Sequence, residues 1–507
     1  MATESALHPL VRRLAEERHL RCPRCGRTQV EVDGNGLRCG ACAATFPAYN
    51  RVVDLHGLVM GPPSSDEDLA RAVALAEPVA KALDLPDAGE VLATVTEVLG
   101  RTASMSAHHD EFDAEIRDIA DRFGIDTGVE PEPPSALGAL LPAPARVDLE
   151  VERHYIPARL PPSTRLTGNV RFRNRGSEAF SSYSSPPVTV GFRWYDERGE
   201  VVAVPEHRTR FPIAMPPGRA VTLPVDFETP GAEGTYTLVV CPVIEERCWV
   251  PTSGVAVQVT VGPAPGLPSS LDLRPDAEPL TYADDHAAAL RLLEAQAASL
   301  LTTPDRKILE VGGAGAPQVS WFGPHDAVNV DINLPLLELG SLWYEHNADD
   351  AVSERLAFLC ADATDLPFES ETFDVVAMFA TLHHFPAPEV LLRECRRLVR
   401  PDGIVAVLCE PVGGSLEDTD TLRDLVKGIN EQVFTVTEYV AIFAAAGLEV
   451  VSGTQVGGSL RVFLRRAEPS GASFTDVVPV PPRLLGGRPT ASDVVRKIRS
   501  RLRKSDG

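Results

Sequence analysis

Residues 308–316, ILEVGGAGA, join a short apolar run to a turn built from glycine and alanine. A run of this kind is typical of a buried strand, and the absence of bulky side chains lets the turn approach a ligand closely. Four further strand-like runs alternate with helical patterns: DAVNVDI (326–332), LAFLCAD (356–362), FDVVAMF (373–379) and GIVAVLCEP (403–411). This alternation predicts βαβ units in a mostly parallel sheet.

Acidic residues accompany the first three of these runs. Glu310 lies in the first, Asp331 stands near the end of the second, 21 residues later, and Asp362 closes the third. The carboxyl ends of parallel strands border the crevice in which open α/β sheets bind ligands. Carboxylates there can accept hydrogen bonds from ribose hydroxyls and from an adenine amino group. The turn contains no G-x-G-x-x-G, and position 317 is proline, which argues against a dinucleotide.

The order of these segments resembles that of the class I S-adenosylmethionine-dependent methyltransferases, in particular their small-molecule (type 11-like) subgroup. FDVVAMFATLHHF (373–385) is similar to the family's fourth-strand segment, and LLRECRRLVRPDGIVAVLCEP (391–411) to its helix, turn and fifth strand. The resemblance implies a Rossmann-like domain over 281–466. It also implies S-adenosylmethionine as cofactor and methyl transfer to oxygen or nitrogen of a small molecule or glycan precursor.

The resemblance further implies which residues hold the cofactor. Glu310 and Gly312 would contact its methionine part. Asp331 would contact the ribose, while Asp362 and Ala363 would contact the adenine. The full predicted set is Glu310, Gly312, Gly313, Gly315, Asp331, Ile332, Asp362 and Ala363.

The turn departs from the family at two positions, where Ala314 and Ala316 stand in place of the usual glycines. An alanine at a position that requires a positive φ would be strained, and we expect such strain to weaken cofactor binding. The alternative is a degenerate domain that keeps the sheet and serves as a binding or scaffold module.

The acceptor side is predicted from residues after the fourth and fifth strands. By the resemblance, His383 and His384 border the acceptor pocket, and either imidazole can take a proton from a hydroxyl or amine near neutral pH. Their alternative role is to cap a helix or line the cofactor site. Methyl transfer is a direct displacement, so correct positioning of the acceptor can contribute more to the rate than a base does. Glu410, Asn430 and Glu431 belong to the same face, and the last two are candidate acceptor contacts, with helix capping as their alternative.

Two C-x-x-C pairs near the N-terminus, Cys22 with Cys25 and Cys39 with Cys42, predict a structural Cys₄ zinc site without an open coordination position. Residues 20–55 resemble the short zinc ribbons that accompany methyltransferases. The arginines around this module are predicted to form a solvated basic face, with contact to RNA or an acidic protein as the alternative: Arg12, Arg13, Arg21, Arg24 and Arg27.

Composition divides the rest of the chain into further predicted parts. Short runs with period-two alternation predict an antiparallel β-sandwich, which loosely resembles immunoglobulin-like domains, and its aromatic residues are predicted to pack in the core. The tail carries a basic amphipathic pattern that can lie on an anionic membrane, with an unstructured tail as the alternative. The expected parts are a zinc ribbon (1–62), a helical segment (63–128), a linker (129–146), the sandwich (147–262), a second linker (263–280), the methyltransferase domain (281–466) and a flexible basic tail (467–507).

Charge and hydropathy restrict the expected substrate class and the expected cellular location. The formal net charge of -23 repels phosphate backbones and disfavours a nucleic-acid substrate. An RNA methyltransferase guided by the ribbon is therefore a secondary hypothesis. No apolar run is long enough to span a bilayer, and the N-terminus lacks the pattern of a secretory signal, so the expected location is the cytoplasm, with peripheral contact at the inner membrane face through the tail. The sequence does not predict the oligomeric state.

Overall fold

The computed structural model describes residues 7–56, 66–86, 89–105, 141, 144–302, 305–321, 325–471, 473–481 and 484 of the 507-residue chain. The chain divides into two compact units. Unit 1 is drawn from residues 1–133, 267–413 and 423–472, and unit 2 from residues 134–266, 414–422 and 473–507. The turn at 308–316, the acidic residues at the neighbouring strand ends and the cysteine module all belong to unit 1.

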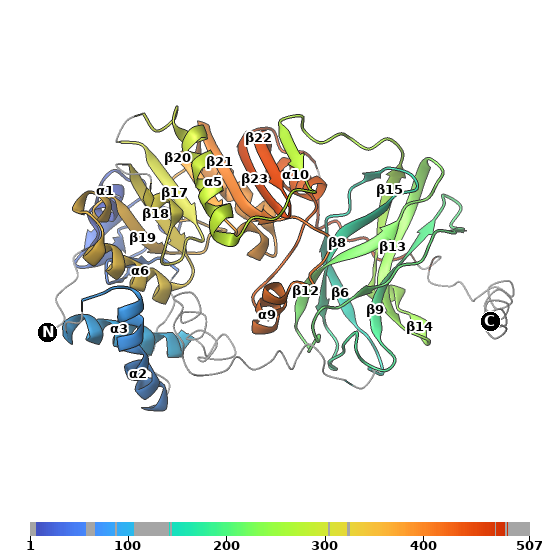
Figure 1. Cartoon of the computed structure of the whole chain (residues 1–507), viewed down its shortest axis with the longest axis horizontal. Helices are drawn as coiled ribbons and strands as arrows, with labels where there is room; N and C mark the ends of the chain where they lie inside the picture. The colour runs from blue at the N-terminus through green and yellow to red at the C-terminus, as the bar shows by residue number, and fades with distance from the viewer. Residues whose placement is uncertain are drawn as a thin grey trace. The chain divides into compact units, whose positions relative to one another are not determined.

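Unit 1 is built on a sheet of ten strands in the order β16-β22-β23-β21-β20-β17-β18-β19-β5-β4 (Figure 1). Neighbouring strands from β21 to β5 are parallel, while β23 runs antiparallel to β21 and β22. The mostly parallel sheet predicted from the sequence is confirmed. The strands are β4 (Ala48–Tyr49), β5 (Val52–Asp54), β16 (Leu271–Arg274), β17 (Lys307–Val311), β18 (Asp326–Asp331), β19 (Leu356–Cys360), β20 (Phe373–Phe379), β21 (Val399–Pro411), β22 (Leu448–Val456) and β23 (Ser459–Arg466).

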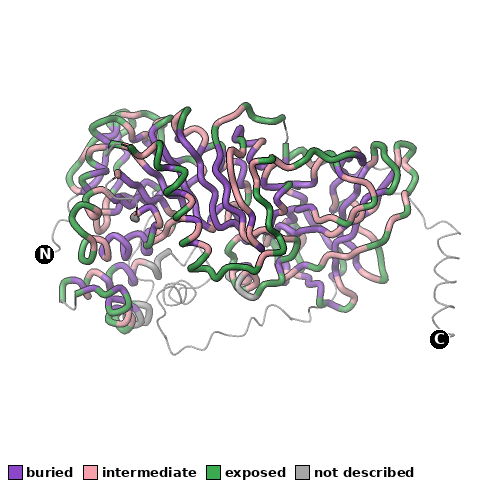
Figure 2. Tube along the Cα trace, turned by 45° about the horizontal axis from the view of Figure 1, so that its top comes forward, coloured by how far each residue is buried: buried purple, intermediate pink, exposed green. Residues whose placement is uncertain are grey.

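Helices cover this sheet because its central strands are apolar on both faces. β19 and β20 are buried along their whole length, as the purple tube of Figure 2 shows for the middle of the sheet. Leu293 of α5 and Leu337 of α6 pack in the same cluster as Ile308 and Val375 of the sheet. The helices and 3₁₀ turns that follow the second linker are α5 (Tyr282–Ala297), η4 (Gln318–Trp321), α6 (Leu334–Asn347), α7 (Asp350–Ser353), η5 (Leu382–His384), α8 (Pro388–Leu398), α9 (Thr419–Lys427) and α10 (Val436–Ala445).

The N-terminal module is continuous with the same sheet. After α1 (Pro9–Glu16), the strands β1 (Val30–Asp33), β2 (Gly36–Cys39) and β3 (Thr45–Phe46) form a small antiparallel sheet. The chain then continues into β5, where Val53 pairs with Leu359 and Asp54 with Cys360 of β19. A bridge between Leu20 and Phe368 adds a second connection.

Two further helices pack on the outside of α6. They are α2 (Asp66–Ala82) and α3 (Gly89–Met105), and their apolar side chains share a cluster with Leu336, Leu339 and Leu342 of α6. The completely buried Glu338 of α6 pairs with Arg101 of α3 and accepts a hydrogen bond from Nδ2 of Asn50 at 2.6 Å. The helical pattern at 66–105 is thus confirmed as a packing unit, while the pattern at 110–125 lies outside the described residues.

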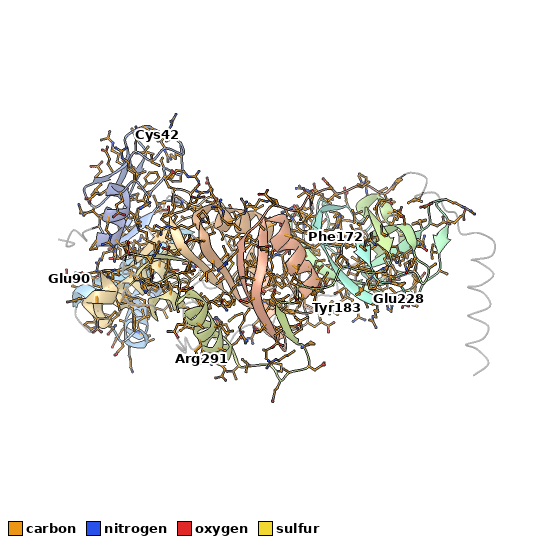
Figure 3. The ribbon with its side chains drawn as sticks, turned by 90° about the horizontal axis from the view of Figure 1, so that it is seen from above. Cys42, Glu90, Phe172, Tyr183, Glu228 and Arg291 are labelled. Carbon is orange, nitrogen blue, oxygen red and sulfur yellow. The ribbon has the colours of Figure 1, made fainter. Side chains whose placement is uncertain are left out.

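Unit 2 contains two sheets, with strand orders β10-β9-β13-β15-β7 and β12-β8-β6; β11 pairs with β9, and β14 with β13. Trp194 of β9 meets Phe227 of β12 edge to face at 6.2 Å, so aromatic side chains join the two sheets. Figure 3 labels Phe172, which is fully buried in this unit, and Tyr183, which is exposed. The strands are β6 (Leu149–His154), β7 (Arg159–Leu160), β8 (Arg165–Asn174), β9 (Val188–Tyr195), β10 (Val201–Val202), β11 (Thr209–Arg210), β12 (Ala220–Glu228), β13 (Gly234–Ile244), β14 (Cys248–Trp249) and β15 (Val255–Val261).

Two segments differ from the sequence-based expectation. Residues 271–274, predicted to be part of a linker, form β16 because their backbone pairs in parallel with β22. Residues 473–481, predicted to be part of a flexible tail, are packed within unit 2: the carbonyl of Phe474 accepts a hydrogen bond from the backbone N–H of His154 at 3.0 Å. The basic segment 494–504 lies outside the described residues. Among the described residues, no helix combines the length and apolar character needed to cross a bilayer.

Candidate cofactor and acceptor site

The candidate site lies at the carboxyl ends of parallel strands in unit 1. From β17 the chain builds outward through β18 and β19, and then crosses back to place β20 and β21 on the other side of β17. This reversal is the topological switch point at which open α/β sheets bind ligands. The predicted cofactor residues belong to the ends of β17, β18 and β19 or the loops after them, and the predicted histidines follow β20.

Asp331 ties the loop after β17 to the start of α6. Its Oδ2 accepts a hydrogen bond from the backbone N–H of Ala314 at 3.0 Å, and its Oδ1 accepts one from Asn333 at 2.9 Å. Asn333 in turn caps α6, because its side-chain oxygen accepts from the N–H of Leu336 at 3.1 Å. The residue predicted to bind ribose therefore also orients the loop beside it.

Ala314 has the left-handed backbone conformation that its sequence position had suggested, with φ 44°. A Cβ there costs roughly 1–2 kcal/mol relative to glycine. Two bonds hold the residue in place: Asp331 accepts from its N–H, and Nδ2 of Asn329 donates to its carbonyl at 2.6 Å. Ala316, the second departure from the family, has no positive φ, so only the first alanine is strained.

Glu310 is buried beneath the same loop. Its Oε1 accepts from the backbone N–H of Gln318 at 3.1 Å, and its Oε2 from that of Val319 at 2.7 Å. Burial, together with the charge of Asp331, raises the pKa of Glu310 to about 7, although the two backbone hydrogen bonds oppose that rise. The structure thus gives this residue a role in shaping the loop, next to its predicted contact with the methionine part.

The predicted glycines let the loop pack closely. A Cβ on Gly312, whose φ is +79°, would come within 2.4 Å of the Thr381 side chain. A Cβ on Gly313 would lie 2.4 Å from Oδ1 of Asn329, and one on Gly315 would lie 2.7 Å from the carbonyl oxygen of Leu336. Any side chain at these positions would displace the loop from β20, β18 or α6.

The residues predicted to face adenine differ in exposure. Ile332, directly after the buried strand β18, is 55% exposed. Asp362 is exposed, and its Oδ1 accepts from the N–H and the hydroxyl of Thr364 at 2.8 and 2.7 Å. Ala363 is buried. The apolar side chain of Ile332 beside the half-buried Asp331 and the exposed Asp362 suits the mixed apolar and hydrogen-bonding surface of an adenosine.

His383 is held from one side by Glu410, at the end of β21. The Nδ1 of His383 lies 3.0 Å from Oε2 of Glu410, which is completely buried. Glu410 also accepts from the backbone N–H groups of Thr381, Leu382 and His383 at 2.8–3.0 Å. Burial works to raise the pKa of Glu410, but His383 and these hydrogen bonds hold it below its usual value.

His384 and Glu431 meet beside this pair. The Nδ1 of His384 lies 2.9 Å from Oε1 of Glu431 and 3.2 Å from the carbonyl oxygen of Asn430. Burial works to lower the pKa of His384, yet the bond to Glu431 and its charge hold the pKa above its usual value. Nδ2 of Asn430 donates to the carbonyl of His383 at 3.4 Å. The structure thus brings together all five residues predicted for the acceptor face.

Other residues of the site were not predicted from the sequence. One is Asn329, whose Nδ2 donates to the carbonyl of Ala314 in the loop after β17. A single amide inside the apolar run DAVNVDI is the sequence signal that could have indicated this contact. The ring of His286 of α5 stacks on that of Phe379 of β20, with 6.2 Å between ring centroids. The ring of Tyr282, which is 75% exposed, lies tilted against it at 4.0 Å. A helix that precedes the first strand of the domain offers no local pattern from which this proximity can be inferred.

The four cysteines of the N-terminal module converge, and Figure 3 shows Cys42 at the outer end of the module. All four sulfur atoms lie within 4.8 Å of one another, and Cys22 to Cys42 and Cys25 to Cys39 measure 3.7 and 3.6 Å. Tetrahedral zinc with bonds of about 2.3 Å requires sulfurs about 3.8 Å apart. Of the basic neighbours, Arg13 pairs with Asp326 and Arg21 with Asp365 of the same unit.

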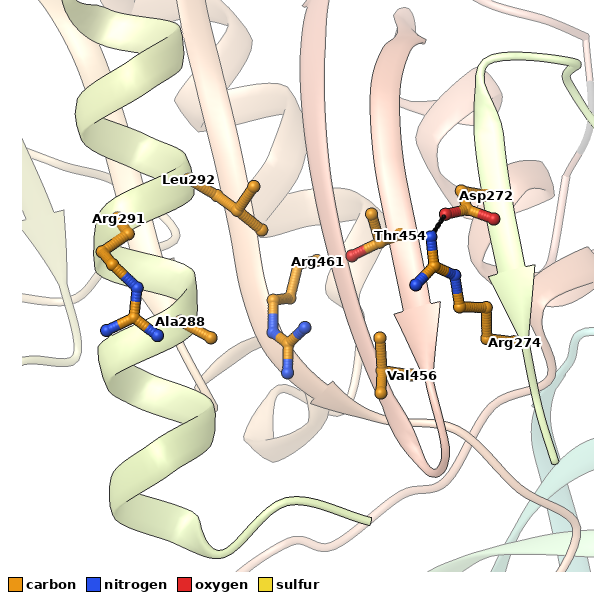
Figure 4. Close-up of a pocket in the computed structure, with 8 residues that line it drawn as sticks. All are labelled: Asp272, Arg274, Ala288, Arg291, Leu292, Thr454, Val456 and Arg461. Carbon is orange, nitrogen blue, oxygen red and sulfur yellow. Dashed lines mark hydrogen bonds and ion pairs between the residues drawn. The ribbon is translucent and has the colours of Figure 1, made fainter. Parts of the chain in front are cut away.

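A hollow of about 320 Å³ lies elsewhere in unit 1, between α5 and the strands β16, β22 and β23 (Figure 4). It is basic, but Arg461 is paired with Asp285, and Arg274 with Asp272. None of the predicted cofactor or acceptor residues lines it: the lining is Asp272, Arg274, Ala288, Arg291, Leu292, Thr454, Val456 and Arg461.

Comparison with known proteins agrees with this geometry. Residues 309–407 match the family described as "Methyltransferase domain". The 27-O-demethylrifamycin SV methyltransferase of Amycolatopsis mediterranei (strain S699) is 31% identical over 188 residues, which cover 34% of this chain and 67% of the relative. Methyltransferase GfsG of Streptomyces halstedii is 27% identical over 203 residues, which cover 38% and 67%. The chain therefore belongs to the class I S-adenosylmethionine-dependent methyltransferases. It is an enzyme of that family. The matched residues, 309–407, do not include the cysteine module or unit 2.

A solved structure is also similar. The 1,6-didemethyltoxoflavin-N1-methyltransferase of Burkholderia thailandensis, which has been crystallised with S-adenosylhomocysteine, has 19% sequence identity and a TM-score of 0.29. The similarity covers 37% of this chain and 81% of that protein.

Proposed function

We propose that this enzyme methylates an oxygen or nitrogen atom of a small molecule or glycan precursor, with oxygen favoured. The observation that carries the proposal is the pairing of two chemistries at one sheet edge. Groups complementary to adenosine follow β18 and β19. The two histidines after β20 meet Glu410 of β21 and Glu431. The name of the Amycolatopsis relative also specifies an oxygen acceptor.

The cofactor side is proposed to divide its work among three strands. S-adenosylmethionine, when bound, supplies an activated methyl group on a sulfonium. Asp331 would accept bonds from the ribose hydroxyls, Asp362 would accept one from the adenine amino group, and the exposed Ile332 would pack against the adenine ring. Glu310 would balance the ammonium of the methionine part, while the close-packed glycine loop excludes water from it.

The acceptor side is proposed to position the nucleophile. His384 is the candidate base because its side chain remains 39% exposed, whereas that of His383 is only 9% exposed and is oriented by Glu410. Methyl transfer is a direct displacement, so a nucleophile held in line with the sulfonium needs little further activation. Asn430 and Glu431 would contribute by fixing the two histidine rings.

The N-terminal cysteine module is proposed to be structural, and unit 2 is proposed to position the acceptor. Zinc bound by the four cysteines would stabilise the N-terminal module, in keeping with the sulfur spacing. We also propose an immunoglobulin-like topology and a positioning role for unit 2. The pairing of Arg13 and Arg21 with aspartates of unit 1 removes two cations from the basic face and weakens the RNA alternative.

The decisive experiment is to incubate the enzyme with methyl-labelled S-adenosylmethionine and a small-molecule extract, and to identify the labelled product. A labelled ether or amine of low molecular mass is expected. Cofactor binding without a labelled product would support a sensor or scaffold, whereas label that appears in RNA and is lost after ribonuclease digestion would support the ribbon-guided alternative.

A further inference from the structure

Three potential metal ligands gather at the acceptor side of the site. Each of His383, His384 and Glu431 offers one ligand atom within 4.8 Å of the others. Nε2 of His383 lies 3.7 Å from Oε2 of Glu431, and Nδ1 of His384 lies 2.9 Å from its Oε1. Metal–nitrogen and metal–oxygen bonds are about 2.0–2.2 Å long, so two ligands of one ion lie about 3–4 Å apart. The side chains already have that spacing.

The hydrogen bond to Glu410 fixes which nitrogen of His383 is available. Glu410 is buried and accepts from three backbone N–H groups, so it acts as a carboxylate acceptor towards Nδ1 of His383. In a neutral imidazole with its proton on Nδ1, Nε2 carries a lone pair. A carboxylate that orients a histidine in this way commonly supports a metal-ligating imidazole.

That lone pair faces another acceptor. The 3.7 Å between Nε2 of His383 and Oε2 of Glu431 exceeds the length of a hydrogen bond. Glu431 is only 5% exposed, and a buried carboxylate is costly unless a cation balances it. Among the described residues, the two histidines are the ones that Glu431 pairs with. A cation between these atoms would satisfy both acceptors at once.

We propose that His383, His384 and Glu431 bind one divalent first-row transition-metal ion beside the acceptor. Two imidazoles and one carboxylate suit such ions, and three protein ligands leave coordination positions for water and for an acceptor oxygen. This site differs in kind from the four-cysteine cluster, whose soft thiolates favour zinc and close the coordination sphere.

The role of the ion rests on the proposed function, whereas its binding does not. With the ion bound, His384 serves as a ligand and no longer as the base. A divalent ion lowers the pKa of a hydroxyl that it coordinates, and the released proton leaves to solvent. The oxygen lone pair then forms the new C–O bond as the C–S bond breaks. The electron pair of the C–S bond remains on sulfur, which changes from a sulfonium to a neutral thioether.

The test uses the full chain with its cysteine cluster loaded with zinc. Mn²⁺ is the probe, because carboxylate and imidazole ligands accept it and thiolates do not favour it. Titration followed by the loss of the electron paramagnetic resonance signal of free Mn²⁺ is expected to reveal one site per chain. The readout is metal binding, so it is independent of methyl transfer and of the acceptor.

Variants distinguish the loss of a metal ligand from an unspecific effect of changing a charged or polar side chain. Glu431→Gln and His384→Asn are expected to weaken Mn²⁺ binding at least about tenfold, on the order of the losses seen for altered metal surroundings. Glu431→Asp should restore part of it, and Glu354→Gln, which changes an exposed carboxylate at the end of α7, should bind like the wild type. S-adenosylmethionine titration of each variant shows that the cofactor site is intact.

The proposal is overturned if the wild type binds neither Mn²⁺ nor Co²⁺ beyond the zinc, or if both ligand variants bind them as the wild type does. The three side chains would then be a proton-sharing network. Metal binding in an enzyme that yields no methylated product would leave this site established and reject the proposed function instead.

Discussion

Asp331 accepts a hydrogen bond from the backbone N–H of Ala314 at 3.0 Å, so the carboxylate that closes the second strand of the domain holds the loop that follows the first. The same residue is predicted to bind the ribose. Loop geometry and cofactor recognition therefore share one side chain, and a change there affects both.

We expect Asp331→Ala to weaken S-adenosylmethionine binding by about 100-fold or more, since it removes two charge-assisted hydrogen bonds of roughly 1.5–3 kcal/mol each. Isothermal titration of the full chain measures the loss. Asp350→Ala, in the exposed first turn of α7, serves as the matched control and should bind normally. Equal affinity of the two variants would remove Asp331 from the cofactor site.

Ala314→Gly should strengthen cofactor binding. Glycine adopts φ 44° without the penalty of a Cβ, so the free-energy cost of the loop's binding conformation would fall by about 1 kcal/mol. The affinity for the cofactor would then rise about fivefold. Ala316→Gly tests the argument, because that residue has no positive φ and its replacement only adds backbone freedom. A gain in the second variant, or a loss in the first, would contradict the assignment of strain.

Binding of S-adenosylmethionine should release a proton from Glu310. Burial raises its pKa to about 7, so the carboxyl is partly protonated just below that pH, and the cofactor's ammonium would favour the ionised form. Affinity should therefore rise as the pH approaches about 7 and then level off. Calorimetry in buffers of different ionisation enthalpy measures the proton.

Glu310→Gln should abolish this release. Glu338→Gln is the control, because burial also raises the pKa of Glu338 to about 7 but its partners are Arg101 and Asn50. In the ligand-free chain, the raised pKa of Glu310 predicts that stability falls as pH rises from 4.5 to about 7. The folded carboxyl keeps a proton in that range which the unfolded one has lost. Unchanged proton release in Glu310→Gln would assign the proton elsewhere.

Cys39→Ser should remove the zinc and lower the melting temperature of unit 1, because Cys39 is fully buried and belongs to the proposed tetrahedral set. Elemental analysis of the purified chain gives the zinc content. Cys248→Ser alters an exposed thiol of unit 2 and should retain one zinc per chain. Zinc retained in the first variant, or absent from the wild type, would count against a Cys₄ site.

The sequence predicted the strands of the site because burial on both faces leaves continuous apolar runs, as in LAFLCAD. It also indicated that an alanine in this turn would be strained wherever the backbone needs a positive φ, but only the structure shows that Ala314 has one and Ala316 does not. It did not predict that Glu310 would bond to Gln318 and Val319, because a loop's path depends on what packs beneath it. The contact of His286 with Phe379 was equally inaccessible, since it joins residues that are 93 positions apart in the chain.

The pairing of Val53 with Leu359 has a practical consequence for anyone who shortens the chain. β5 occupies the hydrogen-bonding edge of β19, so a fragment that starts after residue 56 would present an unprotected, wholly apolar strand to solvent. Exposed edges of that kind pair with other chains. A methyltransferase domain cut out at its family boundaries should therefore aggregate, and its insolubility would say nothing about catalysis.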